Sequence, residues 1–424
     1  MMRRWRLAFL LLGLLLVASC TVGVGTPAHS MGVIKLGVDL PLSGDDAPDG
    51  LPAKNAIDLA IKQAGRVCGP SRHPDACFDL QAITYDDVSQ GIHDPAKGAK
   101  NVQLLVADAR VLAMVGPLYD SVARSELPVA NPVRLVMVSP GTTNECLTQE
   151  PPDGHCQGLS AKLRPGGPNN FFRMVTTQLV EGAAGADLAF KALGKKRAFV
   201  INDQSTFGLG IATAFVARFV RDGGTVVDPS DLGAFDSNQP PAFGSRVQRA
   251  LELGADVIYF AGVGISAAAS LRREMAARMP QVPLIGSDRL ASSQFAKSAG
   301  AAARGSYYTV VGAYPAVLRT AQGFIHDYKT AYSHDVGAFS LPAYDATRLL
   351  VAAIARAIDD AGGTLPTRDQ VLKEVSQTSD YKGAMGATGF DARGDTSLRV
   401  ITAYQWMGAN DPAGQFVVQP TIDS

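Results

Sequence analysis

Short apolar runs and longer stretches with helical spacing alternate along the first part of the chain. Apolar runs of strand length occur at residues 34–40 (IKLGVDL), 80–85, 111–115 and 135–138. Between them, residues 53–64 place an apolar side chain every three or four positions, and residues 95–109 have the length of a helix. This alternation is typical of a parallel sheet covered by helices on both faces. The pattern predicts an α/β lobe.

A segment rich in proline and glycine interrupts the alternation at residues 146–170. Such clusters indicate irregular chain, and we expect this segment to cross to a second lobe. A second series of strand-length runs follows at residues 171–175, 197–201, 256–260 and 283–285. The run at 307–312 leads back to the first lobe, which receives the longest amphipathic helix at 346–358. A last strand at 399–406 crosses again.

Two neighbouring strands of the first lobe are each followed by a small, polar turn. The run at 111–115 ends in GPLYDS, with Tyr119, Asp120 and Ser121, and the run at 135–138 ends in SPGTT, with Gly141, Thr142 and Thr143. The carboxyl ends of parallel strands lie side by side and face unpaired helix N–H groups. The turns therefore predict a binding cleft. Alternatively, Ser121, Thr142 and Thr143 serve only as turn and helix-cap residues.

The size and charge of the chain restrict the possible classes of protein. A chain of 424 residues is longer than one hydrophobic core usually serves, which favours two domains. Basic and acidic residues balance at 39 each, and no RNA-binding or zinc-finger signature occurs. We therefore expect no nucleic-acid partner.

The first twenty residues have the features of a targeting segment. Arg3, Arg4 and Arg6 precede an apolar stretch at 7–17 that is too short for an ordinary membrane span. The following VASC resembles a bacterial lipobox, in which Cys20 becomes the lipidated first residue of the mature protein. A plain signal peptide with an incidental cysteine is the alternative. We expect a lipid-anchored extracytoplasmic protein with a flexible tether at residues 21–32.

Four cysteines remain after Cys20, an even number in an oxidising compartment. Turn residues bracket two local pairs, which favours Cys68 with Cys77 and Cys146 with Cys156; non-local closure stays open. No CxxC or HxxxH spacing suggests zinc, and we expect no metal site.

Several motifs occur in the order and spacing of a known family. IKLGVDLPLSG, TYDD, VGPLYDS, VSPGTT, DQSTFGLG, AYDA and GFDARGD lie between residues 33 and 407. Together they resemble the type I periplasmic binding proteins, specifically the leucine/isoleucine/valine-binding group of ABC importers. The resemblance implies two Rossmann-like lobes, with parallel central sheets joined by three hinge crossings, that close over one small solute. We expect residues 33–147 plus 313–398 in lobe 1, and 165–312 plus 399–420 in lobe 2.

The resemblance also implies the residues that contact the solute. The carboxylate of an amino acid would be held by Tyr119, Asp120, Ser121, Gly141 and Thr143, with Thr142 in the same turn. Lobe 2 would contribute Phe207, Val263 and Asp288, of which Asp288 would accept the ammonium group.

Departures from the family pattern at three positions concern the ligand. Val263 stands where amino-acid binders have a tyrosine, and Asp49 where they have an aromatic residue. Asp120 lies at or beside a position that is usually serine, where its carboxylate would repel a bound carboxylate. Either Asp120 caps its own helix and points away, or the ligand is not an α-amino acid.

No enzyme motif is present, whether G-x-S-x-G, a Walker A loop, H-E-x-x-H or a complete G-x-G-x-x-G after a strand. We therefore expect no catalysis and no cofactor. The expected partners of this monomer are a small polar solute, such as an amino acid or a related compound, and the subunits of an ABC permease. A ligand-sensing receptor of the same fold and a hydrolase on a two-lobed scaffold are the alternatives.

Overall fold

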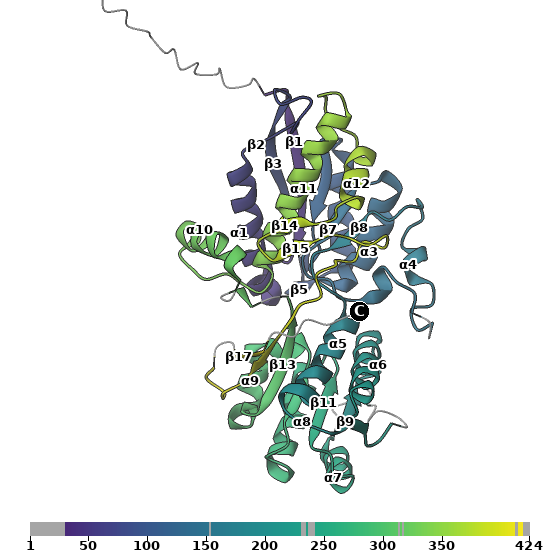
Figure 1. Cartoon of the computed structure of the whole chain (residues 1–424), viewed down its shortest axis with the longest axis vertical. Helices are drawn as coiled ribbons and strands as arrows, with labels where there is room; N and C mark the ends of the chain where they lie inside the picture. The colour runs from purple at the N-terminus through teal and green to yellow at the C-terminus, as the bar shows by residue number, and fades with distance from the viewer. Residues whose placement is uncertain are drawn as a thin grey trace, which may run out of the picture.

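The computed structural model describes residues 30–151, 154–229, 235, 242–312, 314–315, 318–411 and 414–418. The predicted targeting segment with Cys20 and most of the predicted tether lie outside the described residues. The chain folds into two α/β lobes that follow one another along the long axis of the molecule (Figure 1).

The first lobe is built on a six-stranded sheet with the order β2-β3-β1-β6-β7-β8. All neighbouring strands are parallel except β2 and β3. The strands are β1 (Val33–Leu40), β2 (Arg66–Cys68), β3 (Cys77–Asp86), β6 (Val111–Val115), β7 (Val136–Ser139) and β8 (Phe171–Arg173). The helices of this lobe are α1 (Ala47–Ala64), α2 (Pro95–Ala107), α3 (Asp120–Ala130), α4 (Leu159–Lys162), α10 (Gln322–Tyr332), α11 (Ser340–Asp360) and α12 (Arg368–Ser376).

Helical periodicity buries one stripe of α1 and α11 against this sheet. The spacing of Ala53, Ala56 and Ile57 leaves all three side chains fully buried, and α11 packs its long apolar stripe beside them. Thr367 and Gln370 form a capping box at the start of α12. Two hairpins lie outside the sheet, β4 (Val88–Ser89) with β5 (Ile92–His93), and β14 (Tyr381–Gly383) with β15 (Gly386–Thr388).

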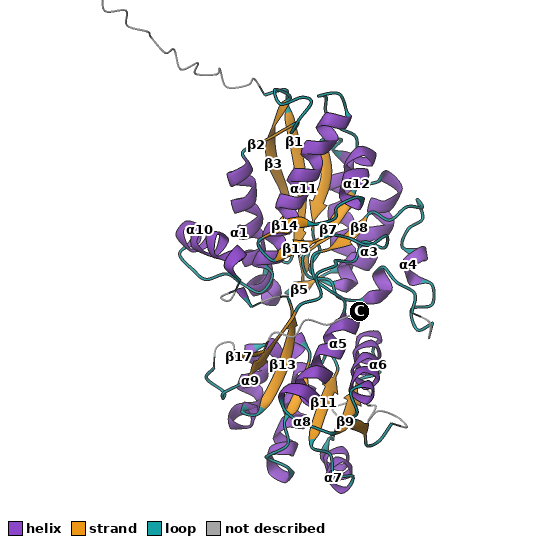
Figure 2. Ribbon diagram, in the orientation of Figure 1, coloured by secondary structure: helices purple, strands orange, loops and turns teal. Residues whose placement is uncertain are grey.

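The second lobe repeats the plan with a seven-stranded sheet in the order β10-β9-β11-β12-β13-β16-β17. Its strands are β9 (Arg197–Asn202), β10 (Thr225–Val226), β11 (Val257–Ala261), β12 (Leu284–Gly286), β13 (Ser306–Val311), β16 (Ile401–Gln405) and β17 (Gln415–Val418). The first five are parallel, and β16 and β17 add two antiparallel strands. Helices α5 (Gln178–Asp187), α6 (Thr206–Arg221), α7 (Gly244–Glu252), α8 (Ile265–Arg278) and α9 (Ser293–Ala299) flank this sheet (Figure 2). The predicted fold class is confirmed.

The sheet pairing corrects one predicted boundary. Residues 165–175 were expected in lobe 2, but β8 pairs in parallel with β7 and completes the first sheet. The irregular segment at 146–170 therefore returns to its own lobe, and the chain crosses after Arg173. The reason is that the apolar Phe171 and Phe172 fill the free edge beside β7 and are buried there.

Three chain segments connect the lobes at one place. The first follows β8 and enters α5, where the Gln178 N–H donates to the Thr143 carbonyl at 2.8 Å. The second leaves β13 at Gly312, and the third enters β16 from Val400. These two are joined because the Gly312 N–H donates to the Val400 carbonyl at 2.8 Å. The three crossings expected from the family resemblance are present.

Both disulfides join the local pairs that the sequence favoured. Cys68 is bonded to Cys77, and Cys146 to Cys156. The first cross-links β2 to β3 at the edge of the sheet, where the two cysteines are register partners. The second closes the loop that precedes β8.

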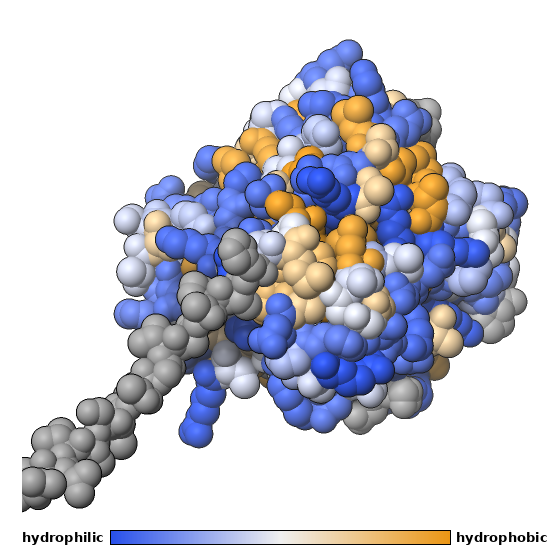
Figure 3. Space-filling model, turned by 90° about the horizontal axis from the view of Figure 1, so that it is seen from above, coloured by the Kyte–Doolittle hydropathy of each residue, from blue (hydrophilic) through white to orange (hydrophobic). Residues whose placement is uncertain are grey.

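None of the described helices combines the length and apolar character needed to cross a bilayer. The end of the molecule seen from above mixes hydrophobic residues with a largely hydrophilic surface (Figure 3).

Candidate functional site

The polar turns lie at the switch points of the two sheets. In the first sheet the strand order reverses between β1 and β6, and in the second between β9 and β11. The loops that leave such strands form a crevice beyond the carboxyl ends of a parallel sheet. The two crevices belong to the ends of the lobes from which the crossings leave, so the turns of one lobe face those of the other.

Tyr119 and Asp49 form a hydrogen-bonded pair in the wall of lobe 1. The Tyr119 hydroxyl donates to Asp49 Oδ2 at 2.9 Å, and the Tyr119 ring stacks on His93 with 4.0 Å between centroids. Asp46 accepts from the His93 backbone N–H at 2.8 Å and holds the ring nitrogen at the same distance. Burial raises the pKa of Asp49, and burial beside Asp49 raises the pKa of Tyr119. The tyrosine therefore stays a neutral donor.

Asp120 occupies the backbone donors of the neighbouring turn. Its Oδ1 accepts from the Thr143 N–H and the Asn144 N–H, each at 3.0 Å. Of the two alternatives for Asp120, capping of its own helix is wrong, because the N-cap of α3 is Tyr119 and no side chain caps it. The carboxylate instead reaches across to the end of β7, where unpaired N–H groups attract an anion. Of these two residues, Thr143 is one that the family resemblance assigned to the carboxylate of the solute.

The other predicted residues of lobe 1 differ in packing and exposure. Gly141 is required by packing, since a Cβ there would lie 2.9 Å from the Leu118 carbonyl oxygen and 3.1 Å from the Phe339 ring. Thr142 and Thr143 are buried, and Thr142 Oγ1 has no hydrogen-bond partner within the described part of the chain. Ser121 is exposed in the first turn of α3.

The wall of lobe 2 contains an arginine that sequence reasoning missed. Arg289 follows Asp288 at the start of the short helix η5 (Asp288–Ala291), directly after β12. Its guanidinium carbon lies 5.5 Å from the centroid of the Phe207 ring, and its Nε lies 3.9 Å from Asp288 Oδ1. Both Nε and that Oδ1 are buried without a hydrogen-bond partner among the residues described.

The predicted contacts of lobe 2 surround this arginine. Phe207 is 8% exposed and belongs to the core between α6 and its sheet, whereas Val263 is 42% exposed at the end of β11. The Val263 N–H donates to Asp203 Oδ2 at 2.8 Å, which ties this turn to the one that starts α6. Glu181 of α5 fixes η5 from below, because its Oε1 accepts from the Asp288 N–H at 2.9 Å.

Electrostatic coupling connects the two walls. Burial lowers the pKa of the Arg289 guanidinium, but the charges of Asp288 and Asp120 and the hydroxyl of Tyr119 outweigh it, and the net shift is upward. Burial raises the pKa of Asp120, against the hydrogen bond from Asn144 and the charges of Arg173 and Arg289. Arg289 of lobe 2 thus acts on the polar groups of lobe 1. The sequence held one signal for it, a charged pair directly after a predicted strand.

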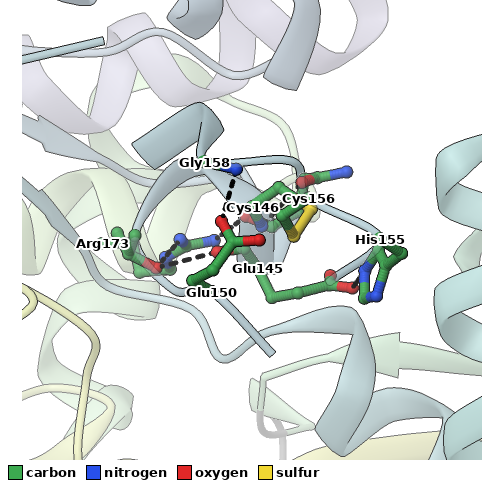
Figure 4. Close-up of a disulfide and its surroundings, with 9 residues drawn as sticks. Glu145, Cys146, Glu150, His155, Cys156, Gly158 and Arg173 are labelled. Carbon is green, nitrogen blue, oxygen red and sulfur yellow. Dashed lines mark hydrogen bonds and ion pairs between the residues drawn. A yellow bond between two sulfur atoms is a disulfide. The ribbon is translucent and has the colours of Figure 1, made fainter. Parts of the chain in front are cut away.

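Glu145 lies beside the crossings, next to the second disulfide (Figure 4). Its Oε1 is 2.8 Å from His155 Nε2, and it faces Gly210 of lobe 2, where a Cβ would approach it to 2.7 Å. Glu145, His155, Cys146 and Cys156 lie close enough together to hold a metal ion. Both sulfurs are joined in the disulfide, so neither is available as a thiolate ligand. The Glu145–His155 pair therefore belongs to the contacts at the junction between the lobes.

Two α/β lobes whose polar strand-end turns face each other across three crossings define the class of hinged, two-lobed ligand-binding proteins. A family model described as periplasmic binding protein matches residues 33–411. The chain belongs to the periplasmic binding protein family, as the motifs of the sequence indicated.

Known relatives share the fold over nearly their full length. A Leu/Ile/Val-binding protein homolog of Brucella melitensis is 24% identical over 92% of this chain and 95% of its own. The leucine-binding protein LivK of Thermotoga maritima superposes with a TM-score of 0.70 at 22% identity, covering 91% of this chain and 98% of that one. A solute-binding protein of an R. palustris ABC transporter, in complex with 4-hydroxybenzoate, has a TM-score of 0.68 at 18% identity, covering 92% and 96%.

Proposed function

We propose that this protein is the extracytoplasmic solute-binding component of an ABC importer and is anchored to the membrane through a lipid on Cys20. It captures one small polar solute between its lobes and presents the closed form to the permease. The observation that carries the proposal is the pair of opposed walls, with Tyr119, Asp49 and Asp120 on one side and Phe207, Asp288 and Arg289 on the other. The relatives named above support it, since they are binding proteins for small solutes.

Closure follows from the placement of the contacts. A solute that touches both walls gains its full set of interactions only when the lobes approach, so binding shifts the hinge equilibrium by that differential affinity. The second and third crossings are linked by a hydrogen bond and the first is bonded to the Thr143 turn, which favours bending about one place. Tyr119, Ser121, Gly141, Thr142, Thr143, Phe207, Val263 and Asp288 are the proposed contacts, and the structure adds Arg289 and Asp49.

The function is tested with the mature chain and a screen of small solutes. Under this proposal at least one amino acid, amide, polyol or small acid raises the melting temperature, because a ligand bound to the native state stabilises it by mass action. The same solute must lower the radius of gyration in small-angle X-ray scattering. Turnover of the solute by the purified protein would contradict the proposal.

A further inference from the structure

The two groups that would recognise an α-amino acid are already engaged by the chain's own side chains. On lobe 1, the N–H groups of Thr143 and Asn144 both donate to Asp120 Oδ1 at 3.0 Å. On lobe 2, the expected acceptor of the ammonium group, Asp288, faces the Arg289 guanidinium at 3.9 Å. A zwitterion would have to displace a buried carboxylate at one end and approach an arginine at the other. Both steps are unfavourable.

Hydrogen-bonding capacity nevertheless remains in the lobe 2 wall. Arg289 Nε is buried and makes no hydrogen bond to any residue that the structure describes, whereas 36% of the side chain is exposed. Asp288 Oδ1 is also buried without a donor in the described residues. Buried donors and acceptors cost stability unless they are paired. These two atoms therefore offer unused capacity to a partner that brings an acceptor to the arginine and a donor to the aspartate.

The surrounding charges select a neutral partner. A free carboxylate would gain Arg289 but would meet Asp288, Asp120 and Asp49. An amine would gain these carboxylates but would meet Arg289 beside Asp288. A carboxamide carries a carbonyl acceptor and an N–H donor on adjacent atoms and has no charge. Phe207, whose ring lies 5.5 Å from the guanidinium carbon, provides an apolar surface beside this position.

From these contacts we propose that Arg289 and Asp288 form a recognition pair for an uncharged carboxamide solute, and that Asp120 excludes α-amino acids by occupying the Thr143 and Asn144 donors. This inference rests on the proposed function of the cleft. It assigns Arg289 and Asp120 as specificity-determining residues.

The test uses series of compounds that share a side chain and differ only in their polar group. One series is L-leucine, isocaproate, isocaproamide and isoamylamine; a second is L-phenylalanine, hydrocinnamate, hydrocinnamamide and phenethylamine; a third is L-alanine, propionate, propionamide and ethylamine. Each compound is measured with the full mature protein by thermal shift and calorimetry. In at least one series the amide should bind about tenfold or more tightly than the amino acid, the acid and the amine.

Variants separate the roles of the residues. Arg289→Gln should weaken amide binding about tenfold or more, since a site built to hydrogen-bond a polar group loses that much when its partner is removed. Arg289→Lys keeps the charge but loses the planar guanidinium. It should also weaken amide binding, and it provides the test if Arg289→Gln does not fold. Asp120→Ser combined with Arg289→Gln should raise the affinity for the amino acid of the same series. Arg221→Gln, an exposed arginine at the far end of α6, is the matched control.

The possible results separate a failure of this inference from a failure of the proposed function. Tighter binding of an amino acid, acid or amine than of its amide overturns the inference and leaves the solute-binding function in place. An amide affinity that is unchanged in both Arg289 variants also overturns the inference alone. No binding of any compound in the three series overturns the inference, and a parallel failure of the broader solute screen overturns the function.

Discussion

Asp120 Oδ1 accepts a hydrogen bond from the backbone N–H of Thr143 at 3.0 Å, and this contact joins the start of α3 to the end of β7. The same oxygen accepts from Asn144, so one carboxylate fixes the turn that the family resemblance assigned to the solute. The bond stabilises the unliganded turn and also reduces the number of donors left for a solute. Stability and specificity are therefore coupled at this residue.

Removing this carboxylate should destabilise the first lobe. Asp120→Ala deletes the acceptor of two partly buried backbone N–H groups, and hydrogen bonds to charged groups contribute about 1.5–3 kcal/mol each. Part of that loss is offset because the carboxylate is itself buried. We expect the free energy of unfolding to fall by about 2 kcal/mol, measured by urea denaturation.

The exposed Asp335 gives the matched control, because surface ion pairs contribute little. Asp335→Asn should leave the urea midpoint unchanged. A midpoint for Asp120→Ala equal to that of the wild type would show that the turn is held without Asp120.

Three carboxyl groups buried behind the cleft predict a pH dependence of stability. Asp39, Asp87 and Glu126 are fully buried. Burial raises the pKa of Asp39 to about 7 and that of Asp87 to about 8, and burial beside Asp39 raises the pKa of Glu126. Asn101 donates to Asp39 Oδ1 at 2.8 Å, and Lys97 partly offsets the two aspartates.

The direction of this pH dependence follows from the linkage between proton binding and folding. Between the ordinary carboxyl pKa and about 8, the folded state binds more protons than the unfolded state, so stability falls as the pH rises through this window. Urea unfolding should give a higher midpoint in mildly acidic buffer than in mildly alkaline buffer. Asp87→Asn should flatten this slope; an equally steep slope in the variant would exclude the cluster as its origin.

The second disulfide should contribute to stability through its loop. Cys146 and Cys156 are separated by 10 residues in the sequence, and closing a loop of this length stabilises the folded state by about 3 kcal/mol in the chain-entropy model. The double variant Cys146→Ser, Cys156→Ser should lose about this amount in urea denaturation. It should also loosen His155 from Glu145. A loss confined to the noise of the measurement would show that the loop is held by its other contacts.

A substitution of the buried Thr142 separates an effect on solute affinity from an effect on the free energy of unfolding. Thr142 Oγ1 has no partner within the described residues, so Thr142→Val removes an unpaired polar atom without a change of shape. The free energy of unfolding should stay equal or rise by up to about 1 kcal/mol. If the hydroxyl contacts the solute, affinity falls in calorimetry; equal affinity would remove Thr142 from the site.

The membrane anchor is tested on Cys20. Cys20→Ala, or treatment with globomycin, should move the protein from the membrane fraction to the soluble fraction. A wild-type protein found wholly in the soluble fraction would contradict anchoring. Because the anchor is covalent and distant from the cleft in sequence, the variant should keep its solute affinity.

Periodicity and turn composition predicted most of the fold. The helical spacing in 53–64 and 346–358 and both disulfides depend on local patterns, and the structure confirms each. The position of β8 was missed because its place depends on pairing with β7, a contact between distant residues that local composition does not encode.

The sequence predicted where the candidate site lies better than which polar groups line it. Strand-end turns indicated Tyr119 and Gly141 to Thr143 as candidates, and the family resemblance added Asp288. Arg289 and the role of Asp120 were not predicted, because the direction of a side chain across a cleft depends on how two lobes are placed. The family pattern supplied positions for binding groups, and this chain fills two of them with its own charges.

The most direct test of the central claim is small-angle X-ray scattering of the wild type and Arg289→Gln, with and without the compound that gives the largest thermal shift in the three series. If the lobes close on a solute held from both walls, the radius of gyration of the wild type falls at a solute concentration that just saturates it, and that of the variant falls less at the same concentration. A wild type that binds the compound in calorimetry with an unchanged radius of gyration would contradict the account.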